Sequence, residues 1–216
     1  PCCTARAPAR SSHSLPRMEP IAIFPGRMQP PHNDHLALIE RALGLLRGPL
    51  VVALLVEGGR ASDPFGRDAA EHHQRARNPF TFLQRAAMLD AALSRDARAR
   101  VRIVPLPRPE CAWDVCVAAF PGPRLWVVPD AGDPFDEAKA AWFTARAEAV
   151  ARPRVVPTTD GRHVRALLAR GDPELRRHVP APVAYWLDAW HHEIESEAEK
   201  RRHEAARRTS WEHERE

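Results

Sequence analysis

Short, nearly continuous apolar segments alternate along the chain with longer amphipathic segments. The short ones are bounded by Gly, Pro or charged residues, which is typical of strands buried in a parallel sheet. We expect strands at residues 21–24, 50–56, 101–106, 125–128 and 154–156. Between them, apolar residues recur at helical spacing. This spacing predicts helices over residues 36–46, 82–93 and 136–150.

Strands that alternate with helices predict one doubly wound α/β domain with a parallel sheet. In such sheets ligands bind beyond the carboxyl ends of the strands, so a site is expected directly after residue 24. The chain has 216 residues, 44% of them hydrophobic, enough for one substantial core, which we place at residues 18–190. Residues 1–17 are predicted to be a disordered extension before a natural start at Met18. Residues 191–216 are predicted to be a charged helix or tail.

Composition and charge indicate which kinds of ligand and which cellular compartment suit this protein. The formal net charge of +4 suits partners rich in phosphate, but without a long basic run we expect small phosphorylated ligands and no nucleic acid. No apolar run approaches the roughly 20 residues that span a bilayer. Four cysteines without a CxxC pair indicate a reducing compartment, so a cytoplasmic protein without a membrane partner is expected. The two lysines, Lys139 and Lys200, do not lie in a Gly-x-x-x-x-Gly-Lys motif, which disfavours a P-loop protein. The sequence does not decide the oligomeric state, and a homo-oligomer is one possibility.

Two imidazoles follow the first predicted strand at the start of an amphipathic helix. His32 and His35 are three residues apart, and residues at this spacing share a helix face. The first turn of a helix offers unpaired N–H groups and a positive dipole end, which favour bound phosphate. From the spacing alone, exposed histidines or a satisfied cap would be the plainer interpretation. The preceding Gly-Arg-x-Gln-Pro makes a phosphate site the favoured one.

A second helix start is predicted near residue 160. Thr159 or Asp160 can cap a helix that Gly171 ends. Arg165 would lie one turn into this helix, where a guanidinium can hold phosphate through paired N–H donors. From spacing alone, ordinary surface arginines would be the plainer interpretation of Arg162 and Arg165.

The stretch from Gly26 to His35 resembles the GRFQPxHxGH signature of nicotinamide-mononucleotide adenylyltransferases, especially their archaeal-type branch. This family lies within the HxGH nucleotidyltransferase, or α/β-phosphodiesterase, superfamily. Residues 77–85 are similar to its NPFTxxER segment, residues 160–171 to its SGTxIRxLLxxG signature, and residues 179–183 to its closing VPxxV. The similarity keeps its order from about Pro20 to Trp190. It implies a Rossmann-like nucleotidyltransferase fold.

The resemblance also implies a reaction. In this family the phosphate of an acceptor attacks the α-phosphorus of a nucleoside triphosphate and pyrophosphate leaves, normally with Mg²⁺ on the phosphates. An anionic phosphate needs no general base, so alignment and charge neutralisation carry the catalysis. The implied activity is transfer of AMP from ATP to a phosphorylated small molecule. A cytidylyltransferase of the same superfamily and a degenerate nucleotide-binding or regulatory protein stay open as alternatives.

Residue by residue, the resemblance assigns three groups of side chains. The residues expected to act on the reacting phosphates are His32, His35 and Arg165. Those expected to bind the nucleotide are Gly26, Arg27, Gln29, Asp34, Asp160, Gly161 and Arg162. Those expected to bind the acceptor are Asn78, Arg85, Glu110 and Trp113. No metal site formed by side chains of the chain is expected.

Four departures from the family pattern change the charge or hydrogen bonding of the expected site. Asp34 replaces the signature's glycine, and one like charge about 5 Å from a phosphate costs around 3 kcal/mol at an effective dielectric of about 20. We expect its carboxylate to turn toward Arg27 or Arg162, or to help hold Mg²⁺. Asp160 and Arg162 replace a serine and a threonine. Glu110 stands where archaeal-type enzymes carry an asparagine that recognises the nicotinamide amide, and an ionised Glu only accepts hydrogen bonds, so recognition of that amide would change.

Further histidines and tryptophans carry less weight. His72-His73 and His191-His192-Glu193 could bind a metal, but adjacent histidines in polar segments are interpreted as solvated. Trp186 and Trp190 are four residues apart, which predicts a packing face rather than a base-stacking platform.

Overall fold

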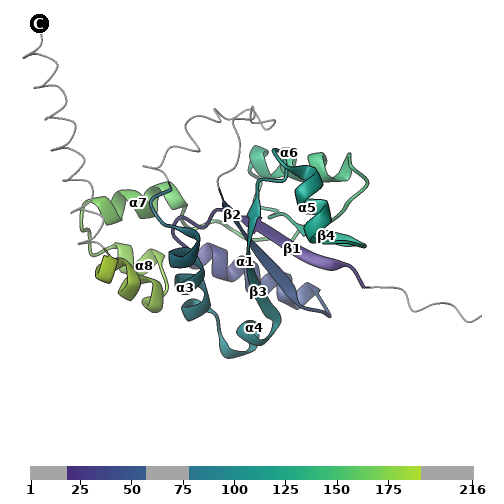
Figure 1. Cartoon of the computed structure of the whole chain (residues 1–216). Coiled ribbons are helices and arrows are strands. Elements are labelled where there is room, and N and C mark those ends of the chain that lie inside the picture. Colours follow the sequence, from purple (N-terminus) through teal and green to yellow (C-terminus); the bar gives the residue numbers. More distant parts are fainter. Residues whose placement is uncertain (1–18, 57–77, 191–216) are drawn as a thin grey trace, which may run out of the picture.

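The computed structural model describes residues 19–56 and 78–190. Its centre is a parallel sheet in the order β3-β2-β1-β4-β5 (Figure 1). The strands are β1 (Ile21–Gly26), β2 (Leu50–Val56), β3 (Val101–Pro107), β4 (Arg124–Val127) and β5 (Ala149–Ala151). β1 pairs with β2 on one side and with β4 on the other, so the strand order reverses at its carboxyl end. That is where open α/β sheets bind ligands.

Helices cover both faces of the sheet, which confirms the predicted doubly wound, Rossmann-like fold. One face carries α1 (Asn33–Leu45), α3 (Phe82–Ala92) and α4 (Arg95–Arg100), and the other carries α5 (Trp113–Ala119) and α6 (Pro134–Thr144). Side chains of β1 alternate between the two cores as the pleat requires. Ala22 and Phe24 pack with α1 and α3, while Ile23 packs with Trp126 and Phe143 on the side of α6.

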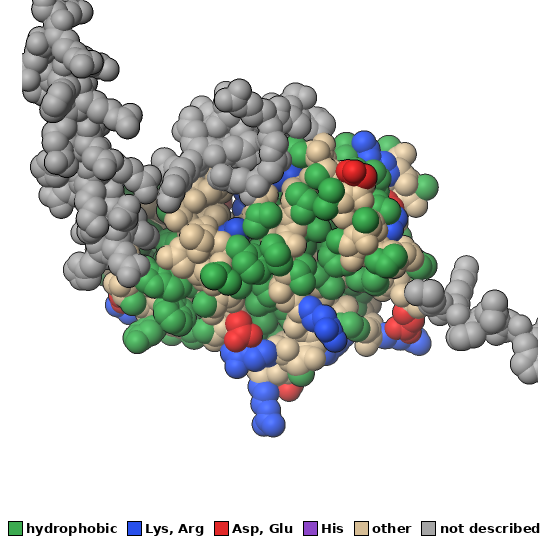
Figure 2. Space-filling view, in the orientation of Figure 1, with side chains coloured by type: hydrophobic (Ala, Val, Ile, Leu, Met, Phe, Trp, Pro, Cys, Tyr) green, Lys and Arg blue, Asp and Glu red, His purple; other side chains and the backbone are tan. Residues whose placement is uncertain are grey.

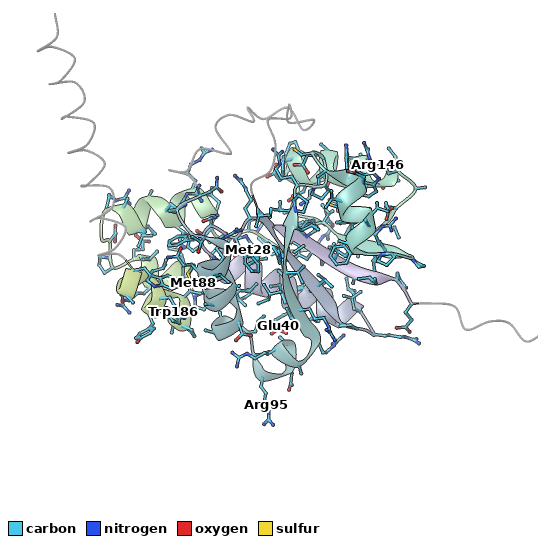
Figure 3. All side chains as sticks on the ribbon, in the orientation of Figure 1. Met28, Glu40, Met88, Arg95, Arg146 and Trp186 are labelled. Atoms are coloured by element: carbon cyan, nitrogen blue, oxygen red, sulfur yellow. The ribbon has the colours of Figure 1, made fainter. Side chains whose placement is uncertain are left out.

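A third apolar cluster lies between α3 and the helices that Figure 1 shows beyond it, at one end of the molecule. It joins α3 to α7 (Gly161–Ala169), α8 (Leu175–His178) and a helix over residues 181–190. Met88 of α3 and Trp186 of the last helix belong to this cluster (Figure 3). Trp186 and Trp190 stack with ring centroids 4.7 Å apart, which confirms the predicted packing face. The cluster fixes α7 relative to the sheet.

The last strand and the helix before it differ from their predicted places. The predicted strand at 154–156 is wrong, because only an isolated bridge from Arg154 to Asp130 forms there. The predicted helix over 136–150 is too long at its end, since α6 stops at Thr144 and β5 begins at Ala149. Between them, Ala147 takes a φ of 58°, which a continuing helix does not allow.

A buried ion pair explains why the strand forms at Ala149–Ala151. Arg124 at the start of β4 and Glu148 just before β5 lie 2.5 Å apart, with 14% and 8% of their side chains exposed. Glu148 also accepts a hydrogen bond from the indole N–H of Trp126. These contacts hold a segment of weak strand propensity beside β4, because tertiary contacts outweigh propensity in sheets.

β3 forms one edge of the sheet. In the view of Figure 2, which has the orientation of Figure 1, apolar side chains gather near the middle of the molecule, where β3 lies. Pro105 and Pro107 lie within β3 and have no N–H to offer a further strand. The prolines therefore disfavour edge-to-edge pairing with another chain.

Several predictions lie outside the described residues. They concern the extension at 1–17, the polar segment with His72 and His73, and the charged tail at 191–216 with His191 and His192. Across residues 19–56 and 78–190, no helix has the length and apolarity to cross a membrane.

Candidate functional site

The first group of candidate residues lies at the start of α1, shortly after β1. His32 is the N-cap residue, with extended backbone angles of −138° and 174°, and His35 is the third helical residue. Their ring centroids are 3.7 Å apart. The backbone N–H of His32 donates to Nδ1 of His35 at 3.2 Å, so a neutral His35 carries its proton on Nε2. The predicted position of both imidazoles at a helix start is confirmed.

His32 has an unsatisfied hydrogen-bonding atom in its buried ring. The residue is 5% exposed, and its Nδ1 is buried without a hydrogen-bond partner. Within the described ranges, two other buried side-chain atoms share this property, Thr159 Oγ1 and His178 Nε2. They lie just before α7 and at the end of α8. Because such an atom costs about 1–3 kcal/mol, these atoms indicate where a ligand would gain hydrogen bonds.

Both imidazoles are neutral at pH 7. Burial lowers the pKa of His32 to about 4, although the charges of Asp34 and Asp160 oppose this shift. Burial also lowers the pKa of His35 well below 6.5, and His32 and Arg27 lower it further. A neutral imidazole carries one N–H, so each ring can donate one hydrogen bond to a phosphate oxygen.

The lowered pKa of His32 predicts a loss of stability in mild acid. Below pH 6.5 the unfolded chain protonates this imidazole, whereas the folded protein resists protonation down to about pH 4. The unfolded state then binds more protons, so the free energy of unfolding falls through this window, by up to about 3 kcal/mol. Urea unfolding between neutral pH and pH 4 should show a weaker pH dependence in His32→Gln. Identical pH dependence in both proteins would contradict the shift.

The loop between β1 and α1 folds back onto the core. Met28 is 1% exposed, has a φ of 47° and lies near the centre of the molecule (Figure 3). A Cβ on Gly26 would lie 3.3 Å from Cε of Met28, so the glycine permits this close approach. Arg27, between them, lines a cavity beyond the sheet. Gly26 therefore leaves room for the buried side chain of Met28.

The start of α7 forms the second predicted helix end. Asp160 is its N-cap and accepts a hydrogen bond from the backbone N–H of His163 at 2.7 Å. This bond and a weaker contribution from the N–H of Arg162 lower the pKa of Asp160 against the effect of burial. The side chain of Arg162 is exposed. The carboxylate that replaces the signature's serine thus caps its own helix.

Arg165 and Gln29 join α7 to the loop after β1. Nη1 of Arg165 donates to the backbone carbonyl of Gln29 at 2.7 Å. A Cβ on Gly161 would come within 3.1 Å of the same Nη1, so a larger residue there would press on the guanidinium. The side-chain amide of Gln29 donates to the carbonyl of Phe80 at 2.9 Å and accepts from its N–H at 3.0 Å. Gln29 therefore connects three segments of the site.

Replacement of Gln29 by leucine is expected to lower the free energy of unfolding by about 2 kcal/mol or more. Gln29 is 6% exposed, so the substitution leaves the N–H and carbonyl of Phe80 buried without partners. Urea unfolding measures the loss. Gln84→Leu is the matched control, because its hydrogen bond to Thr81 lies in an exposed position. Equal losses in the two variants would contradict a special role for Gln29.

A cavity of about 280 Å³ lies beyond the carboxyl end of β2. The structure brings four predicted site residues together in its lining: Arg27, Gln29, Asn78 and Arg85. Arg85 is 3% exposed and donates to the backbone carbonyls of Arg27 at 2.5 Å and Leu55 at 3.1 Å. Its guanidinium therefore holds the ends of β1 and β2 in place.

Glu110 and Trp113 are not among the residues that line this cavity. Glu110 pairs with Arg108, with 2.6 Å between Nε and Oε1 and only 7% of each side chain exposed. Arg108 itself lines the cavity, so Glu110 affects the charge of the cavity only by pairing with that arginine. Trp113 packs against Trp126 and Trp142, with ring centroids 5.7 and 5.4 Å away.

Lys139 is a residue near the site that sequence reasoning missed. It lies on α6, and its Nζ donates to the carbonyl of Pro25 near the end of β1 at 3.0 Å. Burial lowers the pKa of Lys139, although Asp136 and Glu110 oppose this. No local motif could have revealed it, because its position depends on how α6 crosses the sheet.

Asp34 does not make the contacts expected from the sequence. Its carboxylate accepts hydrogen bonds from the N–H of Thr158 at 2.8 Å, the hydroxyl of Thr158 at 2.7 Å and the N–H of Thr159 at 2.9 Å. Burial would raise the pKa of Asp34, but these hydrogen bonds outweigh it and lower the pKa below 3.8. The predicted turn toward Arg27 or Arg162 is therefore wrong, while the alternative that Asp34 helps to hold Mg²⁺ stays a prediction. The true partners were missed because they lie 124 and 125 positions away.

Several known proteins are similar to this chain over most of its length. The nicotinamide-nucleotide adenylyltransferase of Pyrobaculum neutrophilum is 32% identical over 175 residues, which cover 78% of this chain and 87% of the relative. Those of Pyrobaculum aerophilum and Ignicoccus hospitalis are both 28% identical. Their matches cover 78% and 76% of this chain and 87% and 88% of the relatives.

A similarity to a solved structure was also found. A Vibrio parahaemolyticus protein assigned as a nicotinate-nucleotide adenylyltransferase matches with a TM-score of 0.48 and 19% identity, over 79% of this chain and 99% of that chain. No family model matches the chain.

Proposed function

Because the chain belongs to the nicotinamide-nucleotide adenylyltransferase family, we propose that it transfers AMP from ATP to a phosphorylated small molecule and releases pyrophosphate. The observation that carries the proposal is the buried, neutral His32, whose Nδ1 has no partner. It caps α1, and Asp160 and Arg165 of the α7 start lie close enough to shift its pKa. A phosphate between the two helix starts would satisfy this ring and meet two positive dipole ends.

The proposed reaction needs no acid or base from the protein. An oxygen of the acceptor phosphate forms a bond to the α-phosphorus of ATP, and the bond to the bridging oxygen breaks. Pyrophosphate leaves with the electrons of that bond. His32 and His35 would donate neutral N–H groups to the phosphate oxygens, and Arg165 would add positive charge as negative charge develops.

The cavity beyond β2 is proposed to hold the acceptor. Three arginines line it, Arg27, Arg85 and Arg108, and the pairing of Arg108 with Glu110 still leaves an excess of positive charge, which suits a phosphorylated molecule. This placement moves Arg27 from the nucleotide, to which the resemblance assigns it, to the acceptor. Asn78 lies in the same lining and offers both a donor and an acceptor. The ion pair of Glu110 with Arg108 would replace direct recognition of an amide by asparagine, so no particular base is assigned to the acceptor.

Mg²⁺ is proposed to accompany the triphosphate. In the part of the chain that the structure describes, no group of three or more His, Cys, Asp or Glu side chains could hold a metal ion. The carboxylates of Asp34 and Asp160 both accept hydrogen bonds from backbone N–H groups. Mg²⁺ commonly binds through substrate phosphates, where it neutralises their charge, and the chain's own donors would then orient the phosphates.

Pyrophosphate release tests the proposal. The protein is assayed with each of the four ribonucleoside triphosphates, with Mg²⁺, against nicotinamide mononucleotide, nicotinate mononucleotide and other phosphorylated acceptors. Release with ATP and at least one acceptor is expected. Release with CTP alone would identify a cytidylyltransferase instead. Triphosphate binding without release on any acceptor would favour the nucleotide-binding or regulatory alternative and overturn the proposal.

A further inference from the structure

Two departures from the family signatures meet in the folded protein. Asp34 replaces a glycine near the start of α1, and Asp160 replaces a serine at the start of α7. The carboxylate of Asp34 reaches the residue just before this second substitution, because it accepts the N–H of Thr159. The two helix starts are therefore joined directly through a side chain that the family signature lacks.

The hydrogen bonds between Asp34 and the segment of Thr158 and Thr159 are short and numerous. All three hydrogen bonds to Asp34 are between 2.7 and 2.9 Å long, and two of them come from consecutive backbone N–H groups. Hydrogen bonds to an ionised acceptor are roughly twice as strong as neutral ones. The three donors also partly neutralise the negative charge of the Asp34 carboxylate. The repulsion of phosphate that Asp34 would otherwise cause is correspondingly reduced.

Thr159 supplies a hydroxyl close to the position where the signature's serine is lost. While its N–H is held by Asp34, its Oγ1 is buried and has no partner. His32, two positions before Asp34, has the other unsatisfied atom at this end of α1. A hydroxyl can donate to a phosphate oxygen, whereas the ionised carboxylate of Asp160 cannot.

We propose that Asp34 is a positioning residue that holds Thr158 and Thr159 against the start of α1, so that the Thr159 hydroxyl donates to a bound phosphate. This inference rests on the proposed function, since it assigns a phosphate donor in the same site. Asp34 and Thr159 would together take over the roles of the glycine and the serine. The opposite view, that Asp34 only repels the ligand, predicts changes of opposite sign.

Calorimetric titration with inorganic tripolyphosphate and Mg²⁺ tests this on the full chain. Thr159→Val keeps the shape of the side chain and removes the hydroxyl, and it should weaken binding by about tenfold or more. Thr159→Ser should restore most of the affinity. Thr144→Val is the matched control, because its hydroxyl bonds within α6 to the carbonyl of Ala140. It should bind as the natural protein does.

Coupling between the two residues gives the decisive measurement. Asp34→Gly should weaken binding by about as much as Thr159→Val, and the double variant should lose little more than either single variant, because both changes remove the same contact. Melting temperatures of all variants are recorded. If Asp34→Gly fails to fold, Thr158→Val and Asp34→Asn weaken the attachment more gently and take its place in the cycle.

The results also separate this inference from the proposed function. Tighter binding by Asp34→Gly, strictly additive losses, or unchanged affinity in Thr159→Val would overturn the inference alone. If the natural protein binds neither tripolyphosphate nor ATP, both the inference and the proposed function fail.

Discussion

Replacement of His32 by alanine is expected to lower turnover by about a hundredfold or more, with little change in melting temperature. The ring is neutral and its buried Nδ1 has no hydrogen-bond partner, so its removal breaks no hydrogen bond at that atom. An N–H donor aimed at charge that develops during the reaction is worth about two to three decades in rate. His35→Ala should lose similar activity. It should also lose some stability, because His35 accepts the backbone N–H of His32.

Steady-state pyrophosphate release and calorimetric melting together measure the effects of the histidine variants. Arg41→Ala is the control, since this exposed residue lies on α1 but outside its first turn. It should keep normal turnover. If activity and melting temperature fall together in His32→Ala, the two imidazoles form a structural pair and not a phosphate site.

Replacement of Arg165 by lysine is expected to weaken triphosphate binding by about tenfold or more. Lysine keeps the positive charge but loses the planar set of N–H donors with which a guanidinium binds phosphate. It also disturbs the 2.7 Å contact with the carbonyl of Gln29, which holds α7 against the loop after β1. Titration with a nonhydrolysable ATP analogue measures the change.

Arg170→Lys is the matched control for Arg165→Lys. Arg170 lies at the other end of α7 with 61% of its side chain exposed. It should leave affinity unchanged. Unchanged affinity in Arg165→Lys as well would remove Arg165 from the site and leave it the role of a structural contact with Gln29.

Features that depend on nearby residues were predictable from the sequence. The start of α7 appeared where Thr159 or Asp160 can cap an apolar helix face, because capping acts over three or four positions. The start of α1 followed from the apolar face of residues 36–46. The strands β1 to β4 followed from short apolar runs between Gly, Pro and charged residues. β5 was misplaced because its partner contacts, above all the pair of Arg124 with Glu148, come from another strand.

The roles of individual site residues were less predictable than their positions. Gln29 and Arg85 fall in motifs that suggested ligand contacts, yet both hold backbone groups of the protein itself. Glu110 was placed against the acceptor, yet it forms a buried pair with Arg108. A motif records which residue types occur together, and it does not say which polar groups the folded chain will satisfy internally.

The sequence by itself determined the doubly wound fold, the two helix starts and the histidines and arginine placed on them, since each depends on local periodicity and capping. Only the tertiary structure decided which of these groups meet. The pairs that organise the site, Asp34 with Thr158, Lys139 with Pro25 and Gln29 with Phe80, are 124, 114 and 51 positions apart. Such contacts depend on the strand order β3-β2-β1-β4-β5 and on the faces that the helices cover, which no local pattern specifies.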